Sequence, residues 1–208
     1  MKIGIILDGS AETKAMNLIL PKIPIKSSIQ ILPSLYADIQ PKASPGQIGK
    51  SIESRVNICI KKGASQIIVL IDREDREECP GEWAKTLENN FRKKYSSIPI
   101  FVVIKNRKFE NWLMAAISAF NDLPKRFELS QSFIRKIEPN KADSITDAEA
   151  EIHKVVKGNR VRKSIWGQEI AAKCDPDEMG RNSRSFRRFL RLLQHPDYMT
   201  QSKDPVNP

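Results

Sequence analysis

Short apolar runs and amphipathic segments alternate through the first 120 residues of the chain. The apolar runs predict strands at residues 2–7, 29–32, 66–71 and 98–104, of which QIIVLI is the clearest. Apolar residues at helical spacing predict helices at 11–20, 47–62, 82–95 and 108–120. Strands that alternate with helices are typical of a mostly parallel sheet with helices on its faces. The pattern therefore predicts an α/β fold.

The rest of the chain has a mostly helical pattern. No element is evident over 123–145, so a linker or insertion and a packed element both stay open. Helices are predicted at 146–156, 164–173 and 185–194, whereas the prolines and few apolar residues of 196–208 favour a disordered tail. We expect an α/β core over 1–122, a linker or insertion over 123–145, a basic helical region over 146–195 that packs on the core, and the tail.

Two of the predicted helices have a strongly apolar face. In FENWLMA the apolar side chains lie at helical spacing, which predicts that Trp112 packs in the core. In SRSFRRFLRLL one stripe holds Phe186, Phe189, Leu190 and Leu193. The opposite face holds Arg184, Arg187, Arg188 and Arg191. Because the apolar stripe should pack on the core, we expect the four arginines to form an exposed basic band.

Positive charge is concentrated near this last helix. The 35 Lys and Arg residues exceed the 25 Asp and Glu residues, giving a formal net charge of +10. Eleven Lys or Arg residues and only four Asp or Glu residues lie between His153 and His195. Clustered positive charge attracts polyphosphates, so the candidate nucleic-acid contacts are Arg160, Arg162, Lys163, Arg184, Arg187, Arg188 and Arg191. A solvated basic face, or a surface that docks an acidic partner, explains the surplus about equally well.

Several classes of protein are disfavoured by the composition. No apolar run approaches the roughly 18 residues that a membrane span needs, and MKIGIILDG lacks the cleavage site of a secretory signal. The three cysteines form no CxxC pair, so neither a zinc site nor a disulfide framework is indicated. No GxxxxGKS or GxxxxGKT loop is present, so ATP hydrolysis would require a partner. We therefore expect a soluble, cytoplasmic protein without a membrane partner.

Acidic residues follow three of the predicted strands. Asp8 and Glu12 come after the first strand, Asp72 and Glu74 after QIIVLI, and Glu110 after IPIFVVI. The carboxyl ends of parallel strands meet at one edge of a sheet, where ligands of α/β proteins bind. Residues at i and i+2 of an extended chain point to the same side. Asp8, Asp72 and Glu74 are therefore candidate ligands of Mg²⁺ or Mn²⁺, which prefer hard oxygen atoms.

Short acidic residues at strand ends also have ordinary structural uses. They form turns and cap helices, and Asp8, which precedes Gly9, suits either role. IDREDRE is also consistent with a solvated loop in which arginines neutralise the acids. The metal site and these structural roles both remain open at this stage.

The arrangement of acids resembles the TOPRIM pattern of nucleic-acid enzymes. The similarity consists of an acid with Gly after the first strand, a Glu four positions later, and an acid-x-acid pair after a later strand. DGSAE, VLIDRED, FENWLMA and SRSFRRFLRLL together resemble an uncharacterised bacterial TOPRIM-like family, OLD-nuclease-like, that is often encoded beside ATPases and suspected in phage defence. The resemblance implies that Asp8, Glu12, Asp72 and Glu74 are metal-site residues and that Glu110 is a further active-site acid. The usual first acid is Glu, where this chain has Asp8, and the usual pair is two aspartates.

Three functional hypotheses follow. The first is a magnesium-dependent or manganese-dependent nuclease, or nuclease subunit, that cleaves phosphodiester bonds in DNA or RNA. The second is a non-catalytic nucleic-acid-binding or sensor subunit of a complex that contains an ATPase. The third is an α/β protein that binds a small phosphorylated ligand. Metal-dependent cleavage separates the first from the others, and salt-sensitive polymer binding separates the second from the third.

Overall fold

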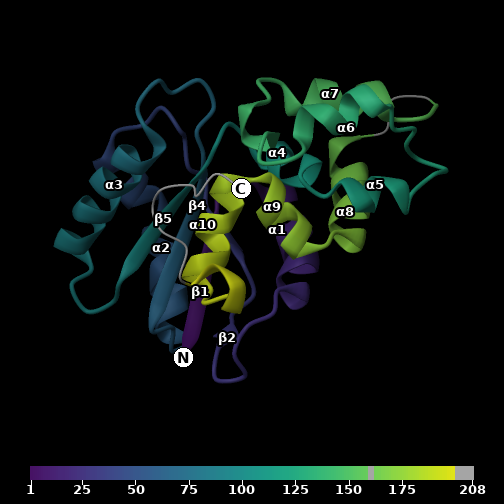
Figure 1. The fold of residues 1–208 in the computed structure, drawn as a ribbon. Helices are drawn as coiled ribbons and strands as arrows, with labels where there is room; N and C mark the ends of the chain where they lie inside the picture. The colour runs from purple at the N-terminus through teal and green to yellow at the C-terminus, as the bar shows by residue number, and fades with distance from the viewer. Residues whose placement is uncertain (159–161, 200–208) are drawn as a thin grey trace.

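The computed structural model describes residues 1–158 and 162–199. Its centre is a five-stranded sheet in which every pairing is parallel (Figure 1). The strand order is β2-β1-β4-β5. The start of β1 pairs with β2, and the end of β1 pairs with β3. The strands are β1 (Lys2–Leu7), β2 (Gln30–Ile31), β3 (Leu35–Tyr36), β4 (Gln66–Asp72) and β5 (Ile100–Lys105). The predicted α/β fold with a mostly parallel sheet is confirmed.

Helices cover both faces of this sheet (Figure 1). One face carries α2 (Pro45–Lys61) and α3 (Pro80–Lys94). The other carries α1 (Ser10–Ile19), the 3₁₀ turn η1 (Leu20–Lys22), α4 (Phe109–Met114) and α5 (Ile117–Asn121). The C-terminal region adds α6 (Gln131–Ile137), η2 (Ala142–Ser144), α7 (Ala148–Val155), α8 (Lys163–Lys173), α9 (Pro176–Asn182), α10 (Arg184–Leu192) and η3 (Pro196–Tyr198). Each of these C-terminal helices and turns buries residues in the core that lies beneath α1 and α4.

Side chains of successive strand residues enter opposite cores, as the period of two in a strand requires. Ile68 and Leu70 of β4 face the core beneath α1 and α10, whereas Ile67, Val69 and Ile71 face the core beneath α2 and α3. Burial on both faces explains why the central strands are continuous apolar runs. Because these pairings are parallel, the carboxyl ends of β1, β4 and β5 meet at one edge.

The predicted helix over 108–120 is two helices, with a break at Ala116 between α4 and α5. The second helix is capped from a distant segment, because the Glu178 carboxylate accepts the backbone N–H of Ser118 at 3.0 Å. The sequence around Ser118 does not predict this cap. The break directs α4 toward the strand ends and α5 toward α8.

Trp112 packs in the core, as its spacing predicted, and it joins the sheet domain to the C-terminal region. It is fully buried, and its ring lies against Phe186 and Phe189 of α10 at centroid distances of 5.0 and 5.6 Å. The predicted apolar stripe of α10 is likewise buried. The indole N–H donates to Ser185 Oγ at 2.7 Å, and Ser185 Oγ donates to the buried Asp143 carboxylate at 2.9 Å. The C-terminal helices therefore share a core with the sheet.

Two segments are more ordered than the sequence indicated. Residues 123–145 are not an open linker, because they contain α6 and η2 and bury Phe133, Ile137 and Ala142 in the core. Residues 196–198, which were predicted to lie in the disordered tail, form η3, and Tyr198 is buried. Both segments gain their order from tertiary burial of a few apolar side chains. Residues 200–208 lie outside the described residues.

The search for membrane-spanning segments gives a simple result. Within residues 1–158 and 162–199, no helix combines the length and the apolar character needed to cross a bilayer.

Candidate carboxylate site

Three carboxylates meet at the carboxyl end of the sheet. Asp8 follows β1, Asp72 ends β4, and Glu12 lies in the first turn of α1. One oxygen from each lies within 4.8 Å of the other two. The backbone N–H of Asp72 also donates to Asp8 Oδ2 at 2.6 Å, which fixes Asp8 against the neighbouring strand. The structure thus brings together the acids predicted from the first two strand ends.

Gly9 gives Glu12 the space to reach this group. A Cβ atom at position 9 would lie 2.7–2.8 Å from the Glu12 side chain, closer than real Cβ contacts allow. The Glu12 carboxylate therefore folds back over the turn between β1 and α1. The N-terminal position of Glu12 in the helix is also favourable, because the helix dipole stabilises negative charge there.

A buried lysine, which the sequence reasoning missed, lies at the centre of the carboxylates. Lys105 ends β5 directly opposite Asp72 in the strand register, and its side chain is fully buried. Its Nζ lies 2.6 Å from Asp8 Oδ1, 2.5 Å from Glu12 Oε2 and 2.9 Å from Asp72 Oδ1. The sequence feature that could have identified Lys105 is its position at the end of a strongly apolar strand. The four residues together are called the carboxylate–lysine cluster below.

The electrostatics of this cluster are set by burial and by unequal charge. Burial raises the pKa of Asp72 to about 7, while Lys105 lowers it and Asp8 raises it further. Burial also raises the pKa of Glu12 well above its usual range, against the lowering effect of Lys105. Burial alone would lower the pKa of Lys105, but the carboxylates of Asp72, Asp8 and Glu12 raise it well above its usual value. Lys105 therefore stays charged, and three carboxylates share one ammonium.

Glu74 does not join this cluster, which corrects the predicted ligand set. The i and i+2 argument assumed that the extended chain continues to residue 74, but β4 ends at Asp72. Glu74 has a left-handed backbone with φ of 52°, and its N–H donates to the carbonyl of Arg107 at 2.9 Å. Among the described residues, the third carboxylate is Glu12. The resemblance had implied Glu12 as a site residue, and the strand geometry had not.

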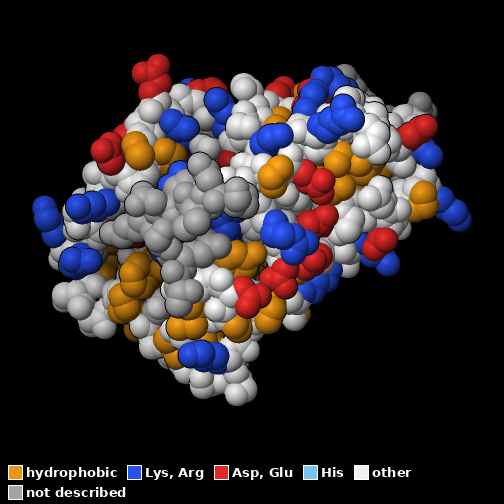
Figure 2. All heavy atoms as spheres, viewed as in Figure 1, with side chains coloured by type: hydrophobic (Ala, Val, Ile, Leu, Met, Phe, Trp, Pro, Cys, Tyr) orange, Lys and Arg blue, Asp and Glu red, His pale blue; other side chains and the backbone are white. Residues whose placement is uncertain are grey.

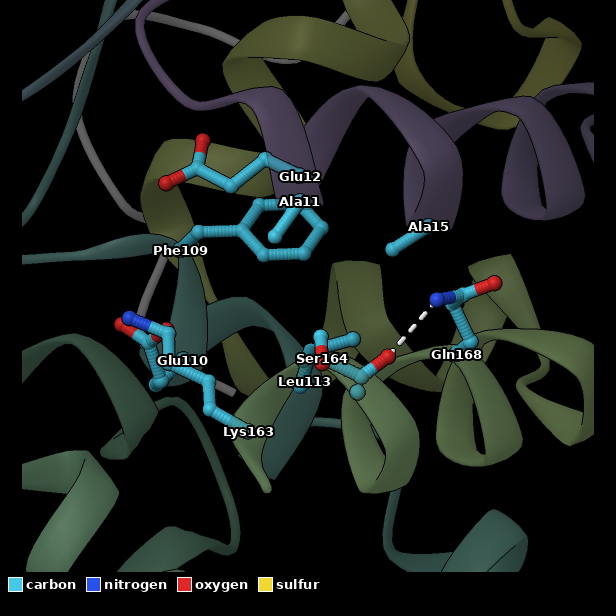
Figure 3. Close-up of a pocket in the computed structure, with 10 residues that line it drawn as sticks. Ala11, Glu12, Ala15, Phe109, Glu110, Leu113, Lys163, Ser164 and Gln168 are labelled. Atoms are coloured by element: carbon cyan, nitrogen blue, oxygen red, sulfur yellow. Dashed lines mark hydrogen bonds and ion pairs between the residues drawn. The ribbon is translucent and has the colours of Figure 1, made fainter.

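Glu110 lies next to the cluster in a separate contact. Figure 3 shows Lys163 reaching from α8 toward Glu110 at the start of α4. Both residues, with Glu12, line a small cavity of about 20 Å³. Glu110 is fully buried, and its carboxylate contacts the Lys163 ammonium. Glu110 contributes to the raised pKa of Asp72. Its charge therefore acts on the cluster, as expected for a nearby acid.

The predicted basic band on α10 is corrected in part. Arg187 is half-buried and donates to the carbonyl of Gly180 at 2.7 Å. Arg188 is also half-buried and donates to the carbonyl of Val102, on the outer edge of β5, at 3.2 Å. Arg184 is exposed and Arg191 is partly exposed. Two of the four arginines are thus committed to intramolecular bonds.

The remaining predicted nucleic-acid contacts lie around α8. Arg162 is exposed and precedes α8, and Lys163 is held by Glu110 as described. Arg160 lies outside the described residues. Figure 2 shows Lys and Arg side chains spread over one face of the molecule, with a row of acidic side chains between them. That face therefore has no single basic band.

A second group of possible metal ligands contains Asp177, His195 and Asp197. His195 is almost fully buried, and its Nδ1 accepts the backbone N–H of Asp197 at 3.2 Å. A neutral imidazole that accepts at Nδ1 carries its proton at Nε2. Nε2 lies 3.0 Å from Asp177 Oδ1 without the direction of a hydrogen bond. This group is explained by packing of η3 against α9.

The carboxylate–lysine cluster fits a hard divalent cation. Its converging donors are carboxylate oxygens, which Mg²⁺ and Mn²⁺ prefer. Asp72 Oδ1 is buried and lies near Lys105 without a well-directed hydrogen bond. A cation beside it would offset the burial that disfavours ionised Asp72 and Glu12. Asp8, Glu12 and Asp72 are the residues that would hold such an ion.

The affinity for Mn²⁺ is expected to rise with pH through the range near 7. The reason is that a cation must displace the proton from Asp72, whose pKa is raised to about 7. Calorimetric titration of the protein with Mn²⁺ at several pH values measures this dependence. The Asp72→Asn variant is the control and should bind weakly at every pH. An affinity for Mn²⁺ that does not change with pH would contradict the assignment.

Comparison with known proteins gives one match. The model of a family described as a domain of unknown function, DUF4276, matches residues 8–194. No curated protein and no solved structure matches the chain. The matched residues run from Asp8 of the cluster through the end of the C-terminal helices.

Proposed function

We propose that this chain, which belongs to the DUF4276 family, is a divalent-metal-dependent nuclease or nuclease subunit that cleaves phosphodiester bonds in DNA or RNA. The observation that carries the proposal is the meeting of Asp8, Glu12 and Asp72 at the carboxyl end of a parallel sheet. Ligand sites of open α/β sheets lie at this edge. The TOPRIM-like order of these acids along the chain supports the same activity.

The residues of the cluster have separate roles in this proposal. A bound Mg²⁺ or Mn²⁺ would supply Lewis-acid chemistry at a phosphodiester. Asp8, Glu12 and Asp72 would hold the cation, and Lys105 at the end of β5 keeps their carboxylates in place.

A second candidate function is supported by Lys105 itself. Its ammonium lies within 2.9 Å of all three carboxylates, where it compensates part of their charge without any metal. A cluster that is stable in this form suits a non-catalytic nucleic-acid-binding or sensor subunit that works with an ATPase partner. This alternative requires binding of nucleic acid without cleavage.

The experiment that tests the proposal compares variants of acids inside the cluster with variants of nearby acids outside it. The purified protein is incubated with labelled plasmid, single-stranded DNA and RNA in the presence of Mg²⁺ or Mn²⁺. We expect Glu12→Gln and Asp72→Asn to lower the cleavage rate by about 100-fold or more, because each removes a charge that would hold the cation. Glu74→Gln should change the rate by less than about threefold, because Glu74 lies outside the cluster.

Asp75→Asn is a further control, because Asp75 is exposed in the loop that follows Asp72. An equal loss of cleavage in Glu74→Gln and Glu12→Gln would restore the ligand set predicted from strand geometry. The absence of metal-dependent cleavage on every substrate would favour the non-catalytic subunit.

A further inference from the structure

Most cations near the carboxyl end of the sheet are engaged within the protein. Lys105 lies in the carboxylate–lysine cluster, and Lys163 contacts Glu110. Arg73 donates to Asn106 Oδ1 at 3.1 Å, and Arg76 donates to Glu78 Oε2 at 2.9 Å. These side chains have little freedom to bind a ligand without losing an existing contact.

Arg107 and Lys108 differ from these residues. Lys108 is exposed and Arg107 is half-exposed, and neither forms an ion pair with a residue in the described part of the chain. They follow Lys105 by two and three residues in the loop between β5 and α4. Because consecutive Cα atoms are about 3.8 Å apart, the Cα atom of Arg107 is within about 8 Å of that of Lys105. Two exposed or half-exposed cations without an ion-pair partner in the described part of the chain therefore follow Lys105 within three residues.

Backbone hydrogen bonds tie this loop to the residues that follow Asp72. The carbonyl of Arg107 accepts the N–H of Glu74, and the carbonyl of Lys105 accepts the N–H of Arg73 at 3.0 Å. The ends of β4 and β5 are thus tied together beyond Asp72. Arg107 also has a φ of 79°, in the left-handed region that favours glycine. An arginine there is less favourable than glycine for the backbone alone, so its side chain is a candidate for a separate role.

We infer that Arg107 and Lys108 bind the phosphates of a nucleic-acid backbone and guide it to the carboxylate–lysine cluster. This inference rests on the proposed function. A guanidinium pairs with two phosphate oxygens at once, and an ammonium adds a second point charge. The loop replaces α10 as the main phosphate contact, because Arg187 and Arg188 of α10 are bound within the protein. The ligand class is a phosphodiester polymer, because the contacts lie outside the carboxylates and extend the site.

The test measures binding without turnover. Fluorescence anisotropy with labelled DNA and RNA oligonucleotides of different lengths, in the presence of Ca²⁺, compares the wild type with Arg107→Gln/Lys108→Gln. We expect affinity to fall at least about tenfold, and the slope of log K against log salt to decrease by about two. The control is Arg184→Gln/Arg191→Gln, which removes the same charge from α10 and should change affinity by less than about threefold.

Arg107→Gly separates a binding role from a folding role. Glycine suits the left-handed backbone, so the melting temperature should stay the same or rise while affinity falls. A folding defect would lower both. Equal losses in the two double variants, unchanged affinity in Arg107→Gln/Lys108→Gln, or binding that does not increase with polymer length would overturn the inference.

The outcomes also distinguish this inference from the proposed function. Binding through Arg107 and Lys108 without metal-dependent cleavage would contradict the proposed nuclease function and support the phosphate contacts. If Arg107→Gln/Lys108→Gln changes neither cleavage nor affinity, the nuclease function is supported and these phosphate contacts are contradicted. A wild type that binds no oligonucleotide overturns the inference.

Discussion

The Lys105→Met variant is expected to lose about 3–5 kcal/mol of unfolding free energy near pH 8. Lys105 is fully buried, and its ammonium is the shared partner of Asp8, Glu12 and Asp72. Methionine has a similar length but leaves three buried carboxylates without a cation. Their mutual repulsion and desolvation then oppose folding.

This loss should depend on pH with a defined sign. An acid whose pKa is raised in the folded state contributes stability below its ordinary pKa, and that stability is lost as the pH rises through the raised value. For Asp72 the interval runs from its usual value of 3.8 to about 7. Removing Lys105 removes a lowering influence on both Asp72 and Glu12. The variant should therefore be closer to the wild type at about pH 5 than at about pH 8.

Urea denaturation at both pH values, with and without Mn²⁺, measures these effects. Mn²⁺ should restore part of the lost stability, because it would replace the missing ammonium. Lys94→Met is the matched control: its partner is the surface residue Glu53, so little change in the unfolding midpoint is expected. A loss in Lys105→Met that is the same at both pH values and insensitive to Mn²⁺ would point to lost packing and not to charge.

Trp112→Ala is expected to destabilise the protein by about 3–5 kcal/mol. The side chain is fully buried between α4 and α10, with Phe186 and Phe189 against its ring. Its removal leaves a cavity where the sheet domain meets the C-terminal helices. Ser185 also loses the indole N–H from the group around Asp143. Guanidinium denaturation followed by circular dichroism measures the change in unfolding free energy.

Trp112→Phe is the matched control, because it keeps an aromatic ring and removes only the N–H and part of the volume. We expect it to cost about 1–2 kcal/mol. Limited proteolysis should cleave Trp112→Ala first within the C-terminal helices, because the contact that holds them is lost. Equal stability of Trp112→Ala and Trp112→Phe would contradict the role of ring packing at this junction.

The sequence was sufficient to predict the elements in which buried residues recur at a regular spacing. The central strands are long apolar runs because helices cover both faces, and the apolar stripe of α10 lies at helical spacing. It was not sufficient for α6, which buries only Phe133 and Ile137 of its seven residues. The break between α4 and α5 depends on Glu178, about sixty residues away in the chain. Short elements and distant caps have no local signal.

The candidate site was predicted in the same uneven way. Asp8 and Asp72 were found because parallel strands end at one edge. Glu74 was misplaced because the alternation of side chains holds only while a strand continues. Lys105 was missed because a lysine after an apolar strand is an ordinary strand ending in sequence. Its burial depends on three carboxylates from other segments, which only the fold brings together.

The contact between Arg188 and Val102 has a consequence for self-association. β5 is an outer strand, and unpaired backbone groups on such a strand can recruit a strand from another molecule. Here the N–H of Val102 donates to Glu88 Oε1 at 2.8 Å, and its carbonyl accepts from Arg188. Two side chains thus take the hydrogen bonds that an added strand would make. This pair protects the outer strand from edge-to-edge aggregation.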